Sequence, residues 1–300
     1  MSAAVASSVA ADPARVAALA ARFGAPPGAA PPPRTVFYGS HESQFYRVHL
    51  PAEGGSAGGP LKTLVVVHGG FWKTKYTVFA AAHETIAPAV VGLGGWAAIE
   101  VEYRRCGEAG GGWPGSAEDV AAALDHALAG EPRADAARVV LLGHSAGGHG
   151  ALFAAADAAA PVALVVAVAP VADLVACHER GLSDDGDAAA TYVGGAPVDA
   201  QRLAAACPTR SALPRALGRC DLLVATGGDD ADVPPDLSRA LYATAAAAAP
   251  PDRAVALLEI PGADHYDVTN AAHAAFAELW ATVEALLGGT AQPAGGPAAG

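Results

Sequence analysis

The stretch VVLLGHSAGGHGALFAAADA, residues 139–158, decides the fold of this chain. It opens with four large apolar residues, Val139 to Leu142, as expected of a strand that is buried on both faces. It closes in a run rich in alanine, which is the strongest helix former. The glycines of residues 143–147 allow a sharp turn between the two. The stretch therefore predicts a strand, a tight turn and a helix in direct succession.

The glycine spacing around Ser145 is typical of a nucleophile elbow, G-x-S-x-G. The serine of such a turn has a strained backbone, so the residues two positions away on either side must lack bulk. Gly143 and Gly147 meet that requirement. The hydroxyl then lies at a helix N-terminus, where the helix dipole favours developing negative charge. Ser145 is thus a candidate nucleophile, and a glycine-rich turn without chemistry is the alternative interpretation.

Segments of the same two kinds alternate along most of the chain. Short β-branched apolar runs, interpreted as strands, occupy residues 63–67, 97–102, 139–142, 164–168, 222–225 and 255–260. Alanine-rich segments, interpreted as helices, occupy residues 78–91, 117–128, 146–158, 235–249 and 268–287. This alternation predicts an α/β fold, a mostly parallel central sheet with helices on both faces. Residues 44–50 precede the set and are expected to add an antiparallel edge strand.

Three segments depart from the alternation. Residues 1–34, rich in Ala, Ser and Pro, are expected to form a flexible N-terminal extension that contains a short helix ending at Phe23. An organelle transit peptide is the alternative for this segment. Residues 171–220 contain short helical fragments without a clear strand and predict a small cap insertion above the sheet. Residues 291–300 predict a disordered tail. The α/β domain is expected to span residues 35–290.

Composition excludes several classes of protein. The 300 residues are 52% hydrophobic and 16% charged, which is too apolar for a disordered chain. Roughly a quarter of them are alanine, several-fold above ordinary usage. The longest uncharged apolar run, residues 158–172, contains two prolines and is shorter than the about 20 residues of a membrane span. The net charge of −12 argues against a nucleic acid or an anionic membrane as partner.

No cofactor or metal is expected from the motifs. The sequence has no HExxH, no Cys/His cluster with ligand spacing, no Walker motif and no GxGxxG after the first strand. A cation held by Asp229, Asp230, Asp232 and His265 is the one arrangement that the spacing permits. The four cysteines lack CxxC spacing and no secretory leader accompanies them, which predicts free thiols and a cytoplasmic location.

A second glycine motif, His68-Gly69-Gly70-Phe71-Trp72, directly follows the strand at residues 63–67. Glycines there free backbone N–H groups to point into a site, and acyl transfer needs such donors for its oxyanion. The expected donors are the N–H groups of Gly70, Phe71 and, from the residue after the nucleophile, Ala146. His68 is expected to form a structural hydrogen bond rather than to act as a base.

Candidate acids and a histidine follow the last two strands. Asp229, Asp230 and Asp232 come after residues 222–225, and His265 comes after residues 255–260. Both loops are expected at the C-terminal edge of the sheet, where sites of α/β proteins assemble. The chain order Ser, Asp, His is that of α/β-hydrolases. His265 is therefore the expected general base, and the three acids compete to orient it.

At this point the chain resembles the α/β-hydrolase superfamily over about residues 38–287. Within it, the chain is similar to HGG-bearing esterases, a group that includes hormone-sensitive-lipase-like carboxylesterases and kynurenine formamidase. The resemblance rests on four features: the motifs at 68–72 and 143–147, Tyr103-Arg104-Arg105, and Trp113-Pro114 with Asp119-Val120. Phe71-Trp72 after HGG is closer to the formamidase branch than to lipases with a third glycine. In the family the acid lies three residues before a Val-Pro pair, which implies Asp230.

The sequence thus predicts a serine hydrolase that cleaves small carboxylic esters or an aryl formamide through an acyl-enzyme. Ser145, Asp230 and His265 are the expected triad, and Trp72, Trp113 and Tyr266 are expected to line the substrate pocket. The expected partner is a small ester or amide, and the oligomeric state stays open. Two alternatives remain: an aminopeptidase-like hydrolase of the prolyl-oligopeptidase type, and a non-catalytic receptor on the same fold.

Overall fold

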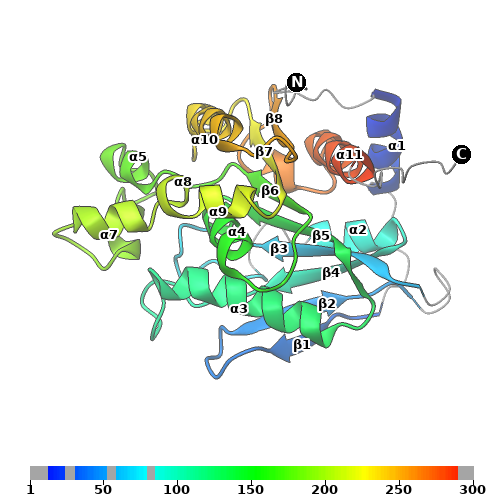
Figure 1. The fold of residues 1–300 in the computed structure, drawn as a ribbon, viewed down its shortest axis with the longest axis horizontal. Helices are drawn as coiled ribbons and strands as arrows, with labels where there is room; N and C mark the ends of the chain where they lie inside the picture. The colour runs from blue at the N-terminus through cyan, green and yellow to red at the C-terminus, as the bar shows by residue number, and fades with distance from the viewer. Residues whose placement is uncertain (1–12, 24–30, 53–58, 80–84, 290–300) are drawn as a thin grey trace, which may run out of the picture.

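The computed structural model describes residues 13–23, 31–52, 59–79 and 85–289. Its centre is an eight-stranded sheet in the order β1-β2-β4-β3-β5-β6-β7-β8 (Figure 1). The strands are β1 (Arg34–Phe37), β2 (Phe45–His49), β3 (Leu61–Val67), β4 (Trp96–Val101), β5 (Ala134–His144), β6 (Leu164–Val168), β7 (Asp221–Gly227) and β8 (Val255–Ile260). From β4 to β8 neighbouring strands are parallel, whereas β2 pairs antiparallel with both β1 and β4, so β2 alone runs opposite to the other strands. The predicted mostly parallel sheet is confirmed.

Each central strand serves two hydrophobic cores, because successive side chains of a strand point to opposite faces. On β3, Val65 and Val67 belong to one core, whereas Leu64 and Val66 belong to the other. This is why the strand segments of the sequence are continuously apolar rather than alternating. Helices must therefore cover both faces of the sheet.

The helices divide between the two cores. One face is covered by α3 (Gly115–Gly130), α4 (Ala146–Asp157), α9 (Leu213–Leu217) and α10 (Pro235–Ala248). The other is covered by α1 (Pro13–Phe23), α2 (Ile86–Gly92) and α11 (Ala274–Gly289). The helix α4 behind Ser145 is buried on every side as far as Ala156, which its alanines and glycines permit because they let neighbouring backbones approach closely.

The register brings the functional loops to one level at the C-terminal edge. Val67, the last residue of β3, pairs with Gly143 of β5, and His144 pairs with Val168 of β6. The loop after β3 and the turn that holds Ser145 therefore leave the sheet side by side. The loops after β7 and β8 leave at the same edge, since these strands are parallel to their neighbours.

The sequence-based element boundaries need three corrections. β2 is antiparallel as expected, but it is not the edge strand, because β1 pairs with its outer side. The helix expected at residues 78–91 is shorter: α2 begins at Ile86, and residues 80–84 lie outside the described residues. The helix expected at 268–287 is a 3-10 turn, η2 (Asp267–Thr269), followed by α11.

Part of the segment expected to be a flexible extension belongs to the core instead. α1 lies beside α11, as Figure 1 shows at the upper right, with the Phe23 and Phe276 rings 5.1 Å apart. Leu19 is buried in the same core, which provides the physical reason for order there. Residues 1–12 and 24–30 of that segment, and the expected tail at 291–300, lie outside the described residues.

The segment expected to form a cap insertion lies between β6 and β7 and consists of short helices: α5 (Leu174–Glu179), α6 (Ala188–Tyr192), α7 (Ala200–Ala205), α8 (Pro208–Ser211) and α9. Ion pairs join the insertion to the loop after β3, because Lys73 Nζ lies 2.6 Å from Asp185 Oδ2 and Lys75 Nζ lies 3.1 Å from Asp184 Oδ2. α9 returns along the sheet and packs beside α4. The insertion is therefore joined both to the loop after β3 and to the helix that follows Ser145.

Two further expectations concern cysteines and membranes. All four cysteines are free thiols, and burial raises the pKa of Cys106 to about 11. Among the described residues, no helix combines the length and the apolar character needed to cross a bilayer.

Candidate active site

Ser145 occupies a strained turn between β5 and α4. Its backbone has φ 55° and ψ −121°, a region that L-residues rarely adopt. The turn is fixed on both sides, because the Ser145 N–H donates to the Val168 carbonyl at 2.8 Å and its carbonyl accepts from Val171 N at 3.1 Å. Strain of this kind persists only where the surroundings over-determine it, and it concentrates at functional sites.

The two glycines of the motif are required by packing. A Cβ on Gly143 would collide with the carbonyl oxygen of Gly147, and one on Gly147 would collide with the carbonyl of Val67. The turn is therefore so tight that α4 begins against the end of β3. This is the steric requirement that the sequence motif predicts.

The loop after β3 lies directly against Ser145. A Cβ on Gly69 would be 2.9 Å from the Cβ of Ser145, so only glycine fits there. The next three residues all have positive φ: Gly70 109°, Phe71 48° and Trp72 56°. Because of these three positive φ angles, the backbone is neither strand nor helix, and its N–H groups do not enter strand or helix hydrogen bonds. In the described part of the chain, no hydrogen bond uses the N–H of Gly70, Phe71 or Ala146. These are the three donors expected from the sequence.

A buried network supports this loop, and His68 is part of it. His68 Nε2 lies 3.1 Å from Glu102 Oε1, its Nδ1 lies 2.8 Å from the Gly69 carbonyl, and its ring stacks on Tyr103 at 4.6 Å. Glu102 also accepts from the backbone N–H of Val78 at 2.8 Å. His68 is thus engaged on both nitrogens, as the structural interpretation predicts. Glu102 was missed by sequence reasoning, because an acid at the end of an apolar strand carries no motif.

The arginines of Tyr103-Arg104-Arg105 hold neighbouring loops rather than a ligand. Arg104 makes a bidentate pair with Asp119 of α3, with both nitrogen–oxygen distances 2.7 Å. Arg105 Nη1 lies 3.1 Å from Glu102 Oε1 and donates to the Tyr76 carbonyl at 2.8 Å. Such paired guanidinium forks fix geometry strongly. They join the loop after β4 to α3 on one side and to the loop after β3 on the other.

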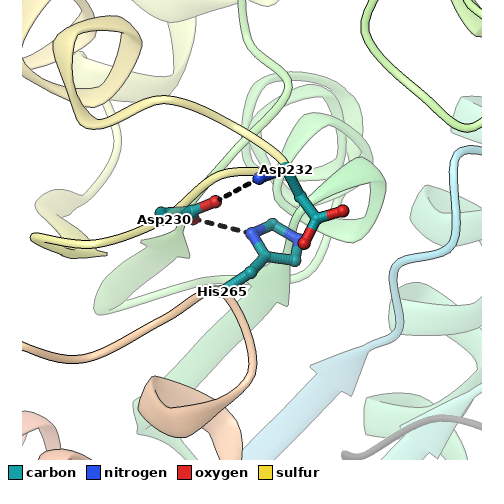
Figure 2. Close-up of side chains that lie close together, drawn as sticks. All are labelled: Asp230, Asp232 and His265. Atoms are coloured by element: carbon teal, nitrogen blue, oxygen red, sulfur yellow. Dashed lines mark hydrogen bonds and ion pairs between the residues drawn. The ribbon is translucent and has the colours of Figure 1, made fainter.

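His265 and Asp230 form a direct, buried pair. His265 Nδ1 donates to Asp230 Oδ2 at 2.7 Å, as the dashed line in Figure 2 shows. The other carboxylate oxygen, Oδ1, accepts from the backbone N–H groups of Asp232 at 3.0 Å and Val233 at 2.8 Å. The bond to Nδ1 fixes the tautomer that leaves Nε2 free to accept a proton. The two backbone bonds explain why the acid precedes Val-Pro by three residues.

The other acids near His265 have different positions. Asp229 is exposed and Asp232 is half-buried, whereas Asp230 is buried against the imidazole. Asp264 Oδ1 accepts from the backbone N–H groups of Tyr266 and Asp267, which shapes the turn that carries His265. Of the three acids that the sequence left in competition, Asp230 is the one bonded to Nδ1.

His144 links the nucleophile turn to the His265 loop. Its Nε2–H donates to the His265 carbonyl at 2.9 Å, and the two rings lie 4.4 Å apart. Because His144 immediately precedes Ser145, this bond fixes the distance between the turn and the loop. The sequence carries no motif that predicts this bond.

The three expected pocket residues occupy different environments. Trp72 is buried and stacks on Tyr192 of the cap insertion with ring centroids 3.9 Å apart. Trp113 is half-buried and packs on Phe153 at 4.7 Å. Tyr266 is 50% exposed, and its ring lies 5.2 Å from that of His265. Tyr266 is therefore the one of the three placed beside the candidate base and open to solvent.

A metal at this site does not fit the hydrogen bonds. Among the described residues, Asp230, Asp232 and His265 are the only histidine, cysteine or acidic side chains close enough together to share an ion. Both oxygens of Asp230 are already engaged, one with the imidazole and one with two backbone N–H groups. The arrangement instead suits a histidine oriented by a carboxylate.

His149, one turn after Ser145 on α4, is a buried neutral histidine. Its Nε2–H donates to the Ala206 carbonyl at 2.8 Å, whereas its Nδ1 has no partner in the described part of the chain. Burial lowers the pKa of His149 to about 3, although the bond to Ala206 opposes that shift. His149 therefore carries no charge at neutral pH.

Comparison with known proteins places the chain in a family. The family model BD-FAE matches residues 48–244, which is more than half of the chain. The chain belongs to the BD-FAE family. The matched region includes the β3 loop, the nucleophile turn and Asp230, whereas His265 lies beyond its end. A comparison with curated proteins gives no match.

Solved structures similar to this BD-FAE family member share its fold. A truncated carbohydrate esterase from gut microbiota has a TM-score of 0.68 at 19% identity, covering 87% of this chain and 99% of that one. Esterase B from Lactobacillus rhamnosis has a TM-score of 0.68 at 21% identity, covering 92% and 93%. A bacterial heroin esterase has a TM-score of 0.67 at 21% identity, covering 91% and 89%. The expected α/β-hydrolase fold is confirmed.

The packing of Gly147 yields a prediction about stability. Gly147→Ala should lower the free energy of unfolding by about 1–3 kcal/mol, because its Cβ meets backbone carbonyls that cannot move aside. Denaturant unfolding measures the change. Gly92→Ala is the matched control: it also adds one methyl group to a helical glycine, but nothing lies within 4 Å of the new Cβ. Equal effects of the two substitutions would contradict the close approach described above.

The burial of neutral His149 yields a prediction about pH. Below its ordinary value of 6.5, the unfolded chain binds a proton that the folded protein, with a pKa of about 3, does not. The contribution of neutral His149 to the free energy of unfolding is therefore fully present above pH 6.5. It falls as the pH drops towards 3, by up to about 1.4 kcal/mol per pH unit. His149→Gln should make the unfolding free energy less dependent on pH in this window. His178→Gln, at an exposed position, should leave the slope unchanged.

Proposed function

We propose that this protein is a serine hydrolase that cleaves small carboxylic esters through an acyl-enzyme. In this proposal Ser145 is the nucleophile, His265 is the general base and then the general acid, and Asp230 orients His265. The N–H groups of Gly70, Phe71 and Ala146 form the oxyanion hole.

The His265–Asp230 pair is the observation that carries the proposal. A buried carboxylate bonded to Nδ1 at 2.7 Å, and itself fixed by two backbone donors, is the arrangement that prepares an imidazole to accept a proton at Nε2. The His144–His265 bond then holds this imidazole close to the strained turn of Ser145. A histidine with a purely structural role would not need a carboxylate that is itself fixed by two backbone donors.

The chemistry follows from these positions. Ser145 Oγ attacks the ester carbonyl carbon while His265 Nε2 takes the hydroxyl proton. The carbonyl oxygen becomes an anion and accepts hydrogen bonds from the loop and helix N–H groups, which need no reorganisation because the backbone already holds them. His265 then protonates the departing alcohol as the carbon–oxygen bond breaks. Water, deprotonated by His265, releases the acid from Ser145 in the second half-reaction.

The three structural neighbours are all named as esterases, which supports esters as the substrate class. The insertion is tied to the β3 loop by the Lys73–Asp185 pair and contributes Tyr192, which stacks on Trp72 of that loop. An insertion held against the expected oxyanion loop in this way favours small substrates over polymers.

An aryl formamide is the second candidate substrate, favoured by two aromatic side chains. Phe71 is half-buried next to the expected oxyanion donors, and Tyr266 is half exposed beside His265. Rings at these positions suit an aromatic leaving group. The burial of Trp72 beneath Tyr192 removes one of the rings expected to support it, so we place the ester first.

Substitutions at the triad test the reaction type. Ser145→Ala and Asp230→Asn should each lower kcat/KM for p-nitrophenyl acetate by about a thousand-fold or more, since each removes one part of a unit that acts together. Asp229→Asn is the matched control, because it removes the same charge from an exposed neighbour. A fluorophosphonate probe should label the wild type and fail to label Ser145→Ala. An Asp229→Asn variant more impaired than Asp230→Asn would overturn the choice of acid, and an unlabelled wild type would favour the non-catalytic receptor.

Substrate comparison tests the class. Acyl esters of increasing chain length, N-formylkynurenine and an aminoacyl p-nitroanilide should be assayed side by side with the same enzyme. We expect the highest kcat/KM for short acyl esters, because the insertion is held against the β3 loop and leaves less room for a long acyl chain. A higher kcat/KM for N-formylkynurenine would move the protein to the formamidase branch. A higher value for the anilide would favour the aminopeptidase-like alternative.

A further inference from the structure

Asp232 places a second carboxylate beside the candidate base. One carboxylate oxygen of Asp232, one of Asp230 and a ring nitrogen of His265 all lie within 4.8 Å of one another. Figure 2 shows Asp232 on the side of the imidazole away from Asp230, where the nitrogen not bonded to Asp230 lies. The two carboxylates therefore flank one imidazole.

In the described part of the chain, the Asp232 carboxylate has no hydrogen-bond or ion-pair partner. The hydrogen bond of this residue runs from its backbone N–H to Asp230 Oδ1, and its side chain forms no bond or ion pair. It is also half-buried, so water screens its charge less than that of exposed Asp229. The backbone bond to Asp230 fixes the main chain of Asp232. From that position the Asp232 carboxylate reaches the His265 ring.

We propose that Asp232 is a second positioning residue for His265, one that stabilises the imidazolium by charge and retains the ring between two carboxylates. The inference rests on the proposed hydrolase function and deepens it. Asp230 sets the tautomer through its bond to Nδ1, whereas Asp232 acts on the charge that appears when Nε2 takes the proton from Ser145. An opposite charge within ~4–6 Å favours the charged form of a group.

Several other titratable groups also face the His265 ring. Asp230 faces His265 from the β7 loop, Asp264 flanks it in its own loop, and the His144 ring packs on it from the nucleophile turn. Tyr266 lies on the solvent side, and burial, reinforced by the charge of Asp232, raises its pKa, which keeps it neutral. Among the acids of the β7 loop, only Asp232 combines proximity to the ring with a free carboxylate.

The stabilised imidazolium has two linked consequences. It speeds attack by Ser145, because the transition state contains that cation. The same charge acts on the imidazole before the reaction, so the acid side of the activity profile should depend on Asp232. Asp232→Asn should therefore lower the plateau of kcat/KM several-fold and move the acid limb of the profile to lower pH by about one unit. A merely structural role would lower the plateau without moving the limb.

The kinetic test measures kcat/KM for p-nitrophenyl acetate across the acid and neutral range. Asp229→Asn is the control, because it removes the same charge one residue before Asp230 from an exposed position, and its acid limb should coincide with the wild type. Asp232→Glu should restore part of the shift, since it returns the charge. Coincident acid limbs for the wild type and Asp232→Asn would overturn the inference while leaving the hydrolase proposal intact.

A second measurement does not depend on activity. The titration of His265 is followed by NMR with ¹⁵N-labelled histidine, assigned with His265→Gln, in the wild type, Asp232→Asn and Asp229→Asn. The His265 midpoint should move to lower pH in Asp232→Asn alone. A shifted midpoint in a protein that hydrolyses no ester would support the charge contact and overturn the hydrolase function. An unchanged midpoint in an active enzyme would overturn the role of Asp232 alone.

Discussion

The tight turn at Ser145 is the constraint on which the other parts of the site depend. Its backbone is held at positive φ because β5 must turn directly into α4 while α4 begins against the end of β3. Two glycines permit that approach, and the bonds to Val168 and Val171 lock it. The parallel sheet supplies the anchors, so the strain at one residue is supported by the packing of two hydrophobic cores.

The flanking loops are fixed to this turn by polar contacts rather than by apolar packing. On one side, Glu102 and His68 hold the β3 loop, with Gly69 pressed against the serine. On the other side, the His144 side chain holds the His265 carbonyl. Each of these contacts is buried. Breaking one would leave a buried polar group without a partner, which costs free energy, so the contacts are expected to persist. The loops thus gain the rigidity that reaction geometry demands without belonging to the sheet.

Much of this organisation was predictable from the sequence, because steric rules leave local traces. G-x-S-x-G and HGG each encode a backbone requirement, and the apolar runs located β6 and β8 to the residue. The choice of Asp230 among three acids came instead from the family resemblance. The contacts of Glu102 and His144 left no such trace, since they join residues distant in the chain. The β1 strand was missed because its short, mostly exposed segment has no apolar run. The burial of Trp72 depends on Tyr192, which lies in an insertion without a readable pattern.

The docking of α1 against α11 has a practical consequence for handling the protein. These two helices lie together on one side in Figure 1, whereas the cap helices α5 and α7 lie on the opposite side. The turn that holds Ser145 lies at the C-terminal ends of the parallel strands, which point towards the cap helices, so a carrier attached near α1 or α11 would lie away from it. Surface immobilisation or display through that side is therefore compatible with free diffusion of small esters to Ser145.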